Sequence, residues 1–190
     1  MQVEMTPLEG VKIITPARFG DDRGFFSESY NRATLANHGI DLEFVQDNHS
    51  ISETVGTIRG LHFQAPPHAQ VKLVRCGRGR VYDVVVDIRV GSPHFGKWFG
   101  IELSFKNGRQ LLVPEGFLHG FVTREPNSEI IYKCSDGYAP DCEGAVRFDD
   151  PAIGIEWGLS GLDAVVSDRD AAAEPLAALD NPFVYGATGP

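Results

Sequence analysis

Short stretches in which apolar and polar residues alternate follow one another from about residue 11 to residue 148. A period of two is typical of strands that bury one face, and these stretches are rich in β-branched and aromatic residues. Many short strands joined by tight turns favour an all-β fold, and we predict a double-stranded β-helix jelly roll with a few short peripheral helices. The predicted strands lie within 11–19, 21–30, 43–52, 57–63, 70–89, 97–105, 110–117, 119–123 and 129–135.

Two turns carry hairpin signals. Gly77 and Gly79 separate the two alternating arms of 70–89, and Asn107-Gly108 separates the strand that ends at residue 105 from the strand that begins at residue 110. Both turns predict that their flanking strands pair with each other. A short helix is predicted over 31–40, and the alanine-rich stretch 165–179 also reads as helical.

The length of 190 residues suits one domain. We therefore expect a single cupin-like domain over 1–190. The composition changes after the last predicted strands, and the segment of about 160–190 is expected to pack over or beside the barrel.

The formal charge of −9 argues against nucleic-acid and anionic-membrane partners, because both require a basic surface. It leaves room for a small anionic ligand in a local basic pocket. The three cysteines, Cys76, Cys134 and Cys142, have no metal-like spacing. An odd number of cysteines and a start without a signal peptide indicate a cytoplasmic protein with reduced thiols.

One spacing indicates a barrel motif. Gly108, Pro114, Gly116 and His119 resemble the second conserved motif of cupin jelly rolls, in which the histidine faces the barrel and often binds a metal. The first motif normally adds a His-x-His pair and a glutamate, but here His62 is followed by Gln64. A neutral amide is a poor ligand for a first-row metal, so no metal is expected. On its own, His119 also fits a core histidine bonded to a backbone carbonyl.

Several stretches stand in the order found in a narrower group: QDNHSIS, GTIRGLHFQAPPHAQVKLVR, VYDVVVDIR, GSPHFGKW, VPEGFLHGF, YKCSDGY and VSDRD. Through them the chain resembles the dTDP-4-dehydrorhamnose 3,5-epimerases over residues 11–175. The resemblance implies a cofactor-free epimerase of dTDP-4-keto-6-deoxyglucose. It also implies a homodimer that exchanges strands between subunits.

The resemblance assigns four residues to the chemistry. Protons at C3 and C5 lie next to the C4 ketone, so their removal gives an enolate with its charge on O4. His62 would be the base and Tyr132 the acid on the opposite face. Asp170 would orient His62, and Lys72 would stabilise the charge on O4.

Each of these residues also has a plainer interpretation. Asp170 fits a solvated helix N-cap, Tyr132 a core tyrosine, and Lys72 an exposed edge lysine. A buried lysine is costly without a charged partner, and Asp83 could pair with Lys72 or with His119.

The remaining predicted contacts are with the ligand. By the same resemblance, Arg59 and Arg23 would meet the diphosphate, and His119 would lie near O4 or the ring hydroxyls. Gly137 replaces a tyrosine that the family often has, which would loosen the nucleotide pocket. Taken alone, the stretch FFSE fits an ordinary amphipathic strand. The nucleotide contacts are assigned to Phe26, Glu28, Gln46, Asn48 and Tyr138.

Two other functions stay open at this point. A mono-epimerase that inverts only C3 or C5 in a natural-product deoxysugar pathway needs the same acid and base. A non-catalytic or metal-binding cupin would need neither.

Overall fold

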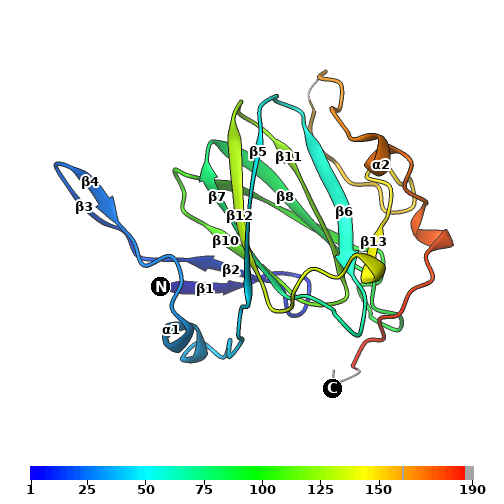
Figure 1. Cartoon of the computed structure of the whole chain (residues 1–190), viewed down its shortest axis with the longest axis horizontal. Coiled ribbons are helices and arrows are strands. Elements are labelled where there is room, and N and C mark those ends of the chain that lie inside the picture. Colours follow the sequence, from blue (N-terminus) through cyan, green and yellow to red (C-terminus); the bar gives the residue numbers. More distant parts are fainter. Residues whose placement is uncertain (160, 187–190) are drawn as a thin grey trace.

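Two antiparallel sheets face each other in the computed structural model, which describes residues 1–159 and 161–186 (Figure 1). This arrangement confirms the predicted all-β jelly roll. The six-stranded sheet has the order β1 (Gln2–Met5), β2 (Lys12–Thr15), β10 (Gln110–Val113), β7 (Lys72–Arg78), β12 (Ser128–Cys134), β5 (Gln46–Ser52). The five-stranded sheet has the order β13 (Glu143–Ala145), β6 (Ile58–Gln64), β11 (Phe117–Thr123), β8 (Arg80–Asp87), β9 (Trp98–Ser104).

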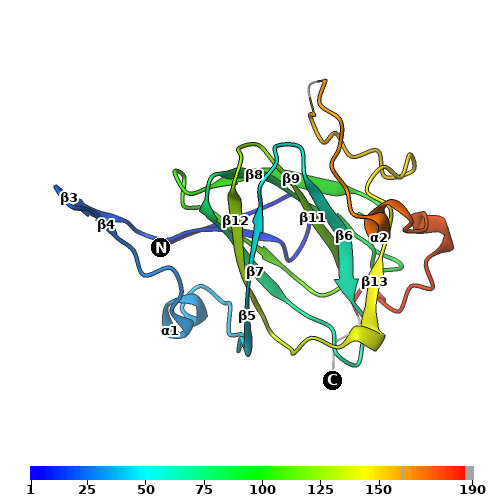
Figure 2. The same ribbon diagram turned by 45° about the horizontal axis from the view of Figure 1, so that its top comes forward.

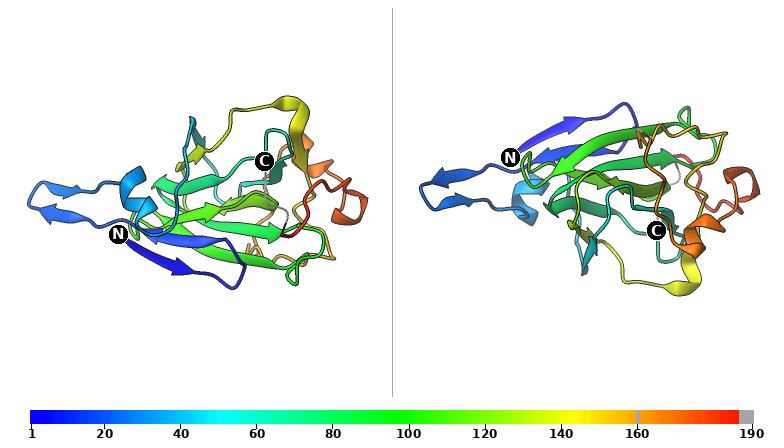
Figure 3. Two further views of the ribbon diagram at one scale, coloured as in Figure 1. Left: turned by 90° about the horizontal axis from the view of Figure 1, so that it is seen from below. Right: turned by 90° about the horizontal axis from the view of Figure 1, so that it is seen from above.

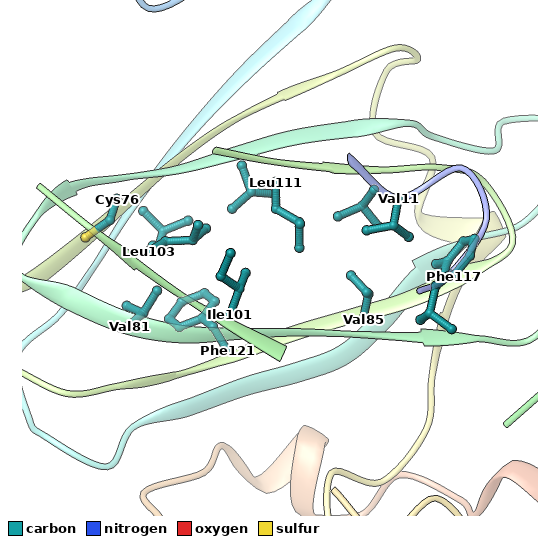
Figure 4. Close-up of a cluster of buried hydrophobic side chains, with 13 residues drawn as sticks. Val11, Cys76, Val81, Val85, Ile101, Leu103, Leu111, Phe117 and Phe121 are labelled. Carbon is teal, nitrogen blue, oxygen red and sulfur yellow. The ribbon is translucent and has the colours of Figure 1, made fainter. Parts of the chain in front are cut away.

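The inner faces of the two sheets enclose the main apolar core (Figure 4). Alternate residues of each strand point inward, so β8 contributes Val81 and Val85, and β10 contributes Leu111 and Val113. These side chains are almost completely buried. Their burial supplies most of the driving force that holds the sheets together.

The outer faces are covered by segments without regular strands. On the five-stranded sheet, Val84 and Leu118 pack against Trp157 and Phe183 of the C-terminal segment. On the six-stranded sheet, Leu73 packs with Leu35 of α1 (Arg32–Ala36). Figure 2 shows α2 (Asp168–Ala171) and the chain after it alongside β6 and β13.

Both hairpin predictions are wrong. β7 and β8 follow each other directly through Gly79, yet β7 pairs with β10 and β12, whereas β8 pairs with β11 and β9. In the same way, Asn107-Gly108 joins β9 of one sheet to β10 of the other. Each turn reverses the chain and carries it across to the facing sheet. Crossing lets each strand bury its apolar face against the opposite sheet.

The helices are short. Asn31 caps α1, which ends before Gly39 at a φ of 73°. The predicted C-terminal helix is largely wrong, because only α2 and the single 3₁₀ turn η2 (Leu176–Ala178) form. Between them, the backbone of residues 174–176 bonds to Arg147 and Asp150 of the neighbouring segment. No helix in the described ranges is long and apolar enough to cross a bilayer.

A separate hairpin projects from the body of the molecule (Figures 1 and 3). It consists of β3 (Phe19–Asp21) and β4 (Gly24–Phe26), and every residue in both strands is exposed. Phe19 and Phe26 are 66% and 70% exposed. Phe25, between them, contacts Phe105 and Arg18 of its own chain. The stretch FFSE therefore has one phenylalanine against the body of the molecule and one that is uncovered.

Candidate active site

A cavity of about 550 Å³ opens between the two sheets, beside the apolar core. The six-stranded sheet, the five-stranded sheet and the C-terminal segment each contribute to its walls. Its walls are Ser50, Thr57, Ile58, Arg59, His62, Lys72, His119, Phe121, Ile130, Tyr132, Val165, Val166, Ser167, Arg169 and Asp170. All four residues assigned to the chemistry therefore share one cavity, together with Arg59 and His119.

His62 and Asp170 form an imidazole–carboxylate pair. The Nε2 atom of His62 lies 2.7 Å from Oδ1 of Asp170, across 108 residues of sequence. The second oxygen of Asp170 accepts a hydrogen bond from the backbone N–H of Gly60. Asp170 is not a solvated cap, because its side chain is 6% exposed and the cap of α2 is Ser167. The pair directs the Nδ1 atom of His62 to the role of proton acceptor.

The C-terminal segment reaches this position through a short parallel bridge. Val165 exchanges backbone hydrogen bonds with the strand around Thr57, donating to Gly56 and accepting from Ile58. This bridge fixes the segment at the cavity wall two residues before Ser167. The carboxylate that partners His62 is thus supplied by a segment outside both sheets.

A second imidazole–carboxylate pair lies on the adjacent strands. His119 stands opposite His62 in the β11–β6 ladder, and its Nε2 atom is 3.0 Å from both oxygens of Asp83 on β8. Asp83 is fully buried. The structure thus settles the two alternatives for Asp83, which pairs with His119 and not with Lys72. The interpretation of His119 as a core histidine bonded to a backbone carbonyl is therefore wrong, because its partner is the Asp83 carboxylate.

Lys72 begins β7, which is an interior strand of its sheet, so Lys72 is not an exposed edge lysine. Within the described part of the chain its ammonium group has no ion pair or hydrogen bond. Burial lowers the pKa of Lys72, and the more distant charges of Cys134, Glu143 and Asp83 offset this only in part. An ammonium group without a partner in a cavity wall is well suited to receive a developing negative charge.

Tyr132 faces the cavity from β12, with Ile130 on the same face, as the alternation along this strand predicted. Burial raises the pKa of the Tyr132 phenol above its ordinary value, and Cys134 adds to the rise. A side-chain hydrogen bond with Asn48 and the charge of Arg59 act in the opposite direction. The phenol therefore keeps its proton at neutral pH, as a proton donor must.

Two arginines bring further positive charge to the cavity. Arg59 is held by β5, because its Nε atom donates to Ser52 Oγ and its Nη2 atom donates to the Ile51 carbonyl, both at 3.0 Å. Arg169 forms a 2.7 Å ion pair with Glu143. The charge of Arg169 is thereby paired, so Arg59 and Lys72 provide the local cationic site in an acidic protein.

Sequence reasoning missed part of this wall. The sequence prediction did not include Arg169 or its ion-pair partner Glu143. Arg169 directly precedes Asp170 in the sequence, and this adjacency was the available signal. Ser50, Thr57 and Phe121 carried no signal, because they are ordinary strand residues whose neighbours come from elsewhere in the fold.

Six of the predicted ligand contacts lie outside the cavity wall. Arg23 is ion-paired with Asp21 on the projecting hairpin, which also carries Phe26 and leads to Glu28. The Gln46 side chain bonds to Asn48 and to the backbone of Tyr138. The ligand contacts of these six residues stay predictions.

Gln64, which stands where a second metal-binding histidine would be, hydrogen-bonds to the backbone of a loop and of its own connection. Its side chain is buried and bonds to the backbone of His68, Gly137 and Ala139. It anchors the loop that follows β12. No cluster of three metal-ligating side chains occurs in the part of the chain that the structure describes.

The jelly roll, with two imidazole–carboxylate pairs, a lysine and a tyrosine at its cavity, defines the class as cupin-like proteins. Within that class, the family model for dTDP-4-dehydrorhamnose 3,5-epimerase matches residues 5–178. The chain belongs to this family.

Individual relatives agree. The dTDP-4-dehydrorhamnose 3,5-epimerase of Salmonella typhimurium is 52% identical over 93% of this chain and 96% of its own. The dTDP-6-deoxy-D-glucose-3,5-epimerase of Legionella pneumophila, solved with dTDP-4-keto-L-rhamnose, is 42% identical, covers 98% and 99% of the two chains, and has a TM-score of 0.93. A 3'-monoepimerase of Streptomyces bikiniensis, solved with dTDP-quinovose, is 34% identical with a TM-score of 0.85 over 91% and 88%.

Proposed function

We propose that this protein is a cofactor-independent 3,5-epimerase that converts dTDP-4-keto-6-deoxyglucose into dTDP-4-keto-rhamnose. The observation that carries the proposal is the placement of His62, Tyr132 and Lys72 around one cavity, with Asp170 behind His62. Epimerisation next to a ketone needs a base, an acid on the other face and a positive charge near the oxygen. These three residues supply those functions.

The mechanism begins with proton removal. His62 takes the proton from C5 or C3 through Nδ1, and Asp170 stabilises the resulting imidazolium. The C–H electron pair moves into the ring to form the enolate, whose charge on O4 lies against the Lys72 ammonium group. Tyr132 then returns a proton to the opposite face of the carbon, which inverts it. Each inversion leaves His62 as an imidazolium and Tyr132 as a phenolate, so His62 releases its proton to solvent and Tyr132 takes one up before the next carbon reacts. With this exchange, electrons and protons balance without a redox cofactor.

The cationic wall suits the nucleotide end of the substrate. The planar guanidinium groups of Arg59 and Arg169 can each make paired hydrogen bonds to phosphate. His119, held by Asp83, lies next to His62 and is placed to contact the ketone or a ring hydroxyl.

Incubation with the 4-keto sugar nucleotide in deuterated water, followed by proton NMR, tests this function. We expect deuterium at both C3 and C5, and a product with both centres inverted. Exchange and inversion at one carbon only would instead identify a mono-epimerase, the activity named for the Streptomyces bikiniensis relative. No exchange at either carbon would leave a sugar-nucleotide binding protein. Activity that a chelator abolishes would indicate a metal-dependent reaction.

Tyr132→Phe separates the two halves of the mechanism. Proton removal by His62 persists, whereas delivery to the opposite face is slowed by roughly 10²–10⁴-fold. Deuterium should then enter with retention of configuration. Normal inversion in this variant would show that another group is the acid.

We also propose a homodimer in which each subunit places its β3–β4 hairpin at the cavity of its partner. Each residue of the two hairpin strands is exposed, and Arg23, Phe26 and Glu28 lie outside the cavity of their own chain. Exposed phenylalanines on a projecting hairpin indicate a surface that another protein covers. A cytoplasmic location is supported by three cysteines that are all free thiols.

Subunit complementation tests the exchange. His62→Gln and Arg23→Ala proteins are each expected to be nearly inactive. After mixing and subunit exchange, up to about a quarter of the wild-type activity should return, because half of the dimers are mixed and each has one intact site. No recovery from a mixture shown by mass spectrometry to contain mixed dimers would refute a shared site.

A further inference from the structure

Three polar side chains link the loop after β12 to the phenol of Tyr132. On β5, Gln46 and Asn48 point to the same side of the strand, and Asn48 stands directly opposite Tyr132 in the β5–β12 ladder. The backbone N–H of Tyr138 donates to Gln46 Oε1 at 2.9 Å. The Nε2 atom of Gln46 donates to Asn48 Oδ1 at 3.0 Å.

These contacts determine which way both amides point. A backbone N–H is only a donor, so the oxygen of Gln46 must face Tyr138, and its NH₂ group must then face Asn48. The carbonyl of Asn48 accepts that hydrogen bond and so faces Gln46. Its NH₂ group is therefore the side that faces β12, where it lies 3.6 Å from Cys134 Sγ, and Asn48 lowers the pKa of Tyr132, the residue opposite it.

We propose that Gln46 is a positioning residue for the catalytic acid, because it orients the amide of Asn48 so that Tyr132 accepts a hydrogen bond and keeps its own proton for the substrate. The inference rests on the proposed role of Tyr132. If the Asn48 amide were reversed, its carbonyl would accept the phenolic proton and compete with the substrate carbon for it. In the observed orientation the phenolate left after proton transfer also keeps a donor.

The electrostatics of Tyr132 agree with this orientation. Burial is the largest influence and raises the pKa of Tyr132, Cys134 raises it further, and Asn48 is the hydrogen-bonding neighbour that lowers it. An amide carbonyl in that place would have the opposite effect. The titratable and charged groups that face the phenol are Cys134 on its own strand, Arg59 and His62 on β6, Lys72 on β7, His119 on β11, Glu143 on β13, and Arg169 and Asp170 in the C-terminal segment.

Two substitutions at Gln46 test the proposal. Gln46→Glu can still accept from the Tyr138 N–H but cannot donate to Asn48, so the Asn48 amide should reverse. Gln46→Met removes both bonds without adding charge. We expect kcat to fall roughly tenfold in Gln46→Glu and by a smaller factor in Gln46→Met, with KM for the sugar nucleotide unchanged. His49→Gln, on the same strand but facing away, should behave like the wild-type protein.

A second measurement needs no turnover. The ionisation of Tyr132 is followed by NMR of protein labelled at the tyrosine Cζ carbon, with the resonance assigned from Tyr132→Phe. We expect the pKa of Tyr132 to rise in both Gln46 variants. An unchanged Tyr132 titration and an unchanged kcat in Gln46→Met would overturn the proposal. If KM rose at the same time, Gln46 would act on the nucleotide and not on the phenol. If the wild-type protein failed to epimerise, the proposed function would fall, while the titration would still report on the amide orientation.

Discussion

The space between the two sheets contains two regions that the same fold builds in opposite ways. In the apolar region, around Leu103 and Leu111, almost completely buried side chains from both sheets fill the gap (Figure 4). In the polar cavity, which shares β7, β11 and β12 with the apolar region, inward positions carry His62, Lys72 and Tyr132 around about 550 Å³ of space. The apolar region stabilises the fold, whereas the polar cavity gathers the groups to which we assign the chemistry.

Lys72 illustrates the difference most directly. An inward position on β7 is occupied by Val74 two residues later, where it packs in the apolar core. At Lys72 the same inward direction places an ammonium group where burial lowers its pKa. The protein therefore gives up stability at this position for a positive charge that is not already neutralised.

The largest effect is expected from removing the base. His62→Gln retains a side-chain donor for Asp170 but has no group that accepts a proton at neutral pH. We expect kcat to fall by roughly 10²–10⁴-fold, with thermal stability close to that of the wild type. Deuterium exchange into the substrate measures the loss. Exchange at the wild-type rate would exclude His62 as the base.

Replacing the buried ammonium group should separate activity from stability. In Lys72→Met, kcat is expected to fall by roughly 10²–10³-fold because the enolate loses its positive charge. Because burial lowers the pKa of Lys72, the folded state binds this proton less tightly than the unfolded state, so the charge costs stability below the folded pKa. The variant should therefore gain about 1 kcal/mol or more in urea unfolding at neutral pH. Lys133→Met, on the outer face, is the matched control, and a destabilised Lys72→Met would contradict the argument.

A substitution in the apolar region should have the reverse profile. Leu111→Ala is expected to lower the free energy of unfolding by about 2–5 kcal/mol, because it leaves a cavity among fully buried side chains. kcat should stay near the wild-type value at temperatures where the variant is folded. Leu162→Ala, at an exposed position, should change stability by less than about 0.5 kcal/mol. A large fall in kcat for folded Leu111→Ala would show that the two regions are coupled.

The smallest expected effect is on the alkaline side of the pH profile. The pKa of Lys72 is lowered and that of Tyr132 is raised, so Lys72 should lose its proton first as pH increases. kcat should then decline at a pH below that of an ordinary lysine. In Lys72→Arg the guanidinium stays charged, and the decline should move to higher pH, where Tyr132 ionises. An unchanged alkaline limb in Lys72→Arg would assign it to another group.

Most strand positions were predictable from the sequence because a period of two directly reflects one buried and one open face. β1 and β13, of four and three residues, lie outside the predicted ranges because they are too short to show a period. Strand partners were not predictable. The Gly79 and Asn107-Gly108 turns reverse the chain as predicted, but the strands that they join belong to different sheets. A turn is a local feature, whereas the choice of partner depends on which pairing buries the inner faces of both sheets.

The candidate site shows the same division. The roles of His62, Lys72, Tyr132 and Asp170 were predicted only through the resemblance to a family. Taken alone, Asp170, Tyr132 and Lys72 each also fitted a structural role. Two features of the site could not be predicted: the part of the wall formed by Ser50, Thr57 and Arg169, and the orientation of the Asn48 amide. Both depend on contacts between distant segments.

The sequence alone therefore determined the period of most strands and the all-β class, which follow from residue types and their spacing, and its resemblance to a family supplied the reactive groups and the pairing of Asp170 with His62. Only the tertiary structure decided that Asp83 pairs with His119 and that Lys72 has no partner within the described residues. The physical reason is that burial and charge pairing arise when the two sheets and the C-terminal segment close around one space, and no local pattern specifies that closure.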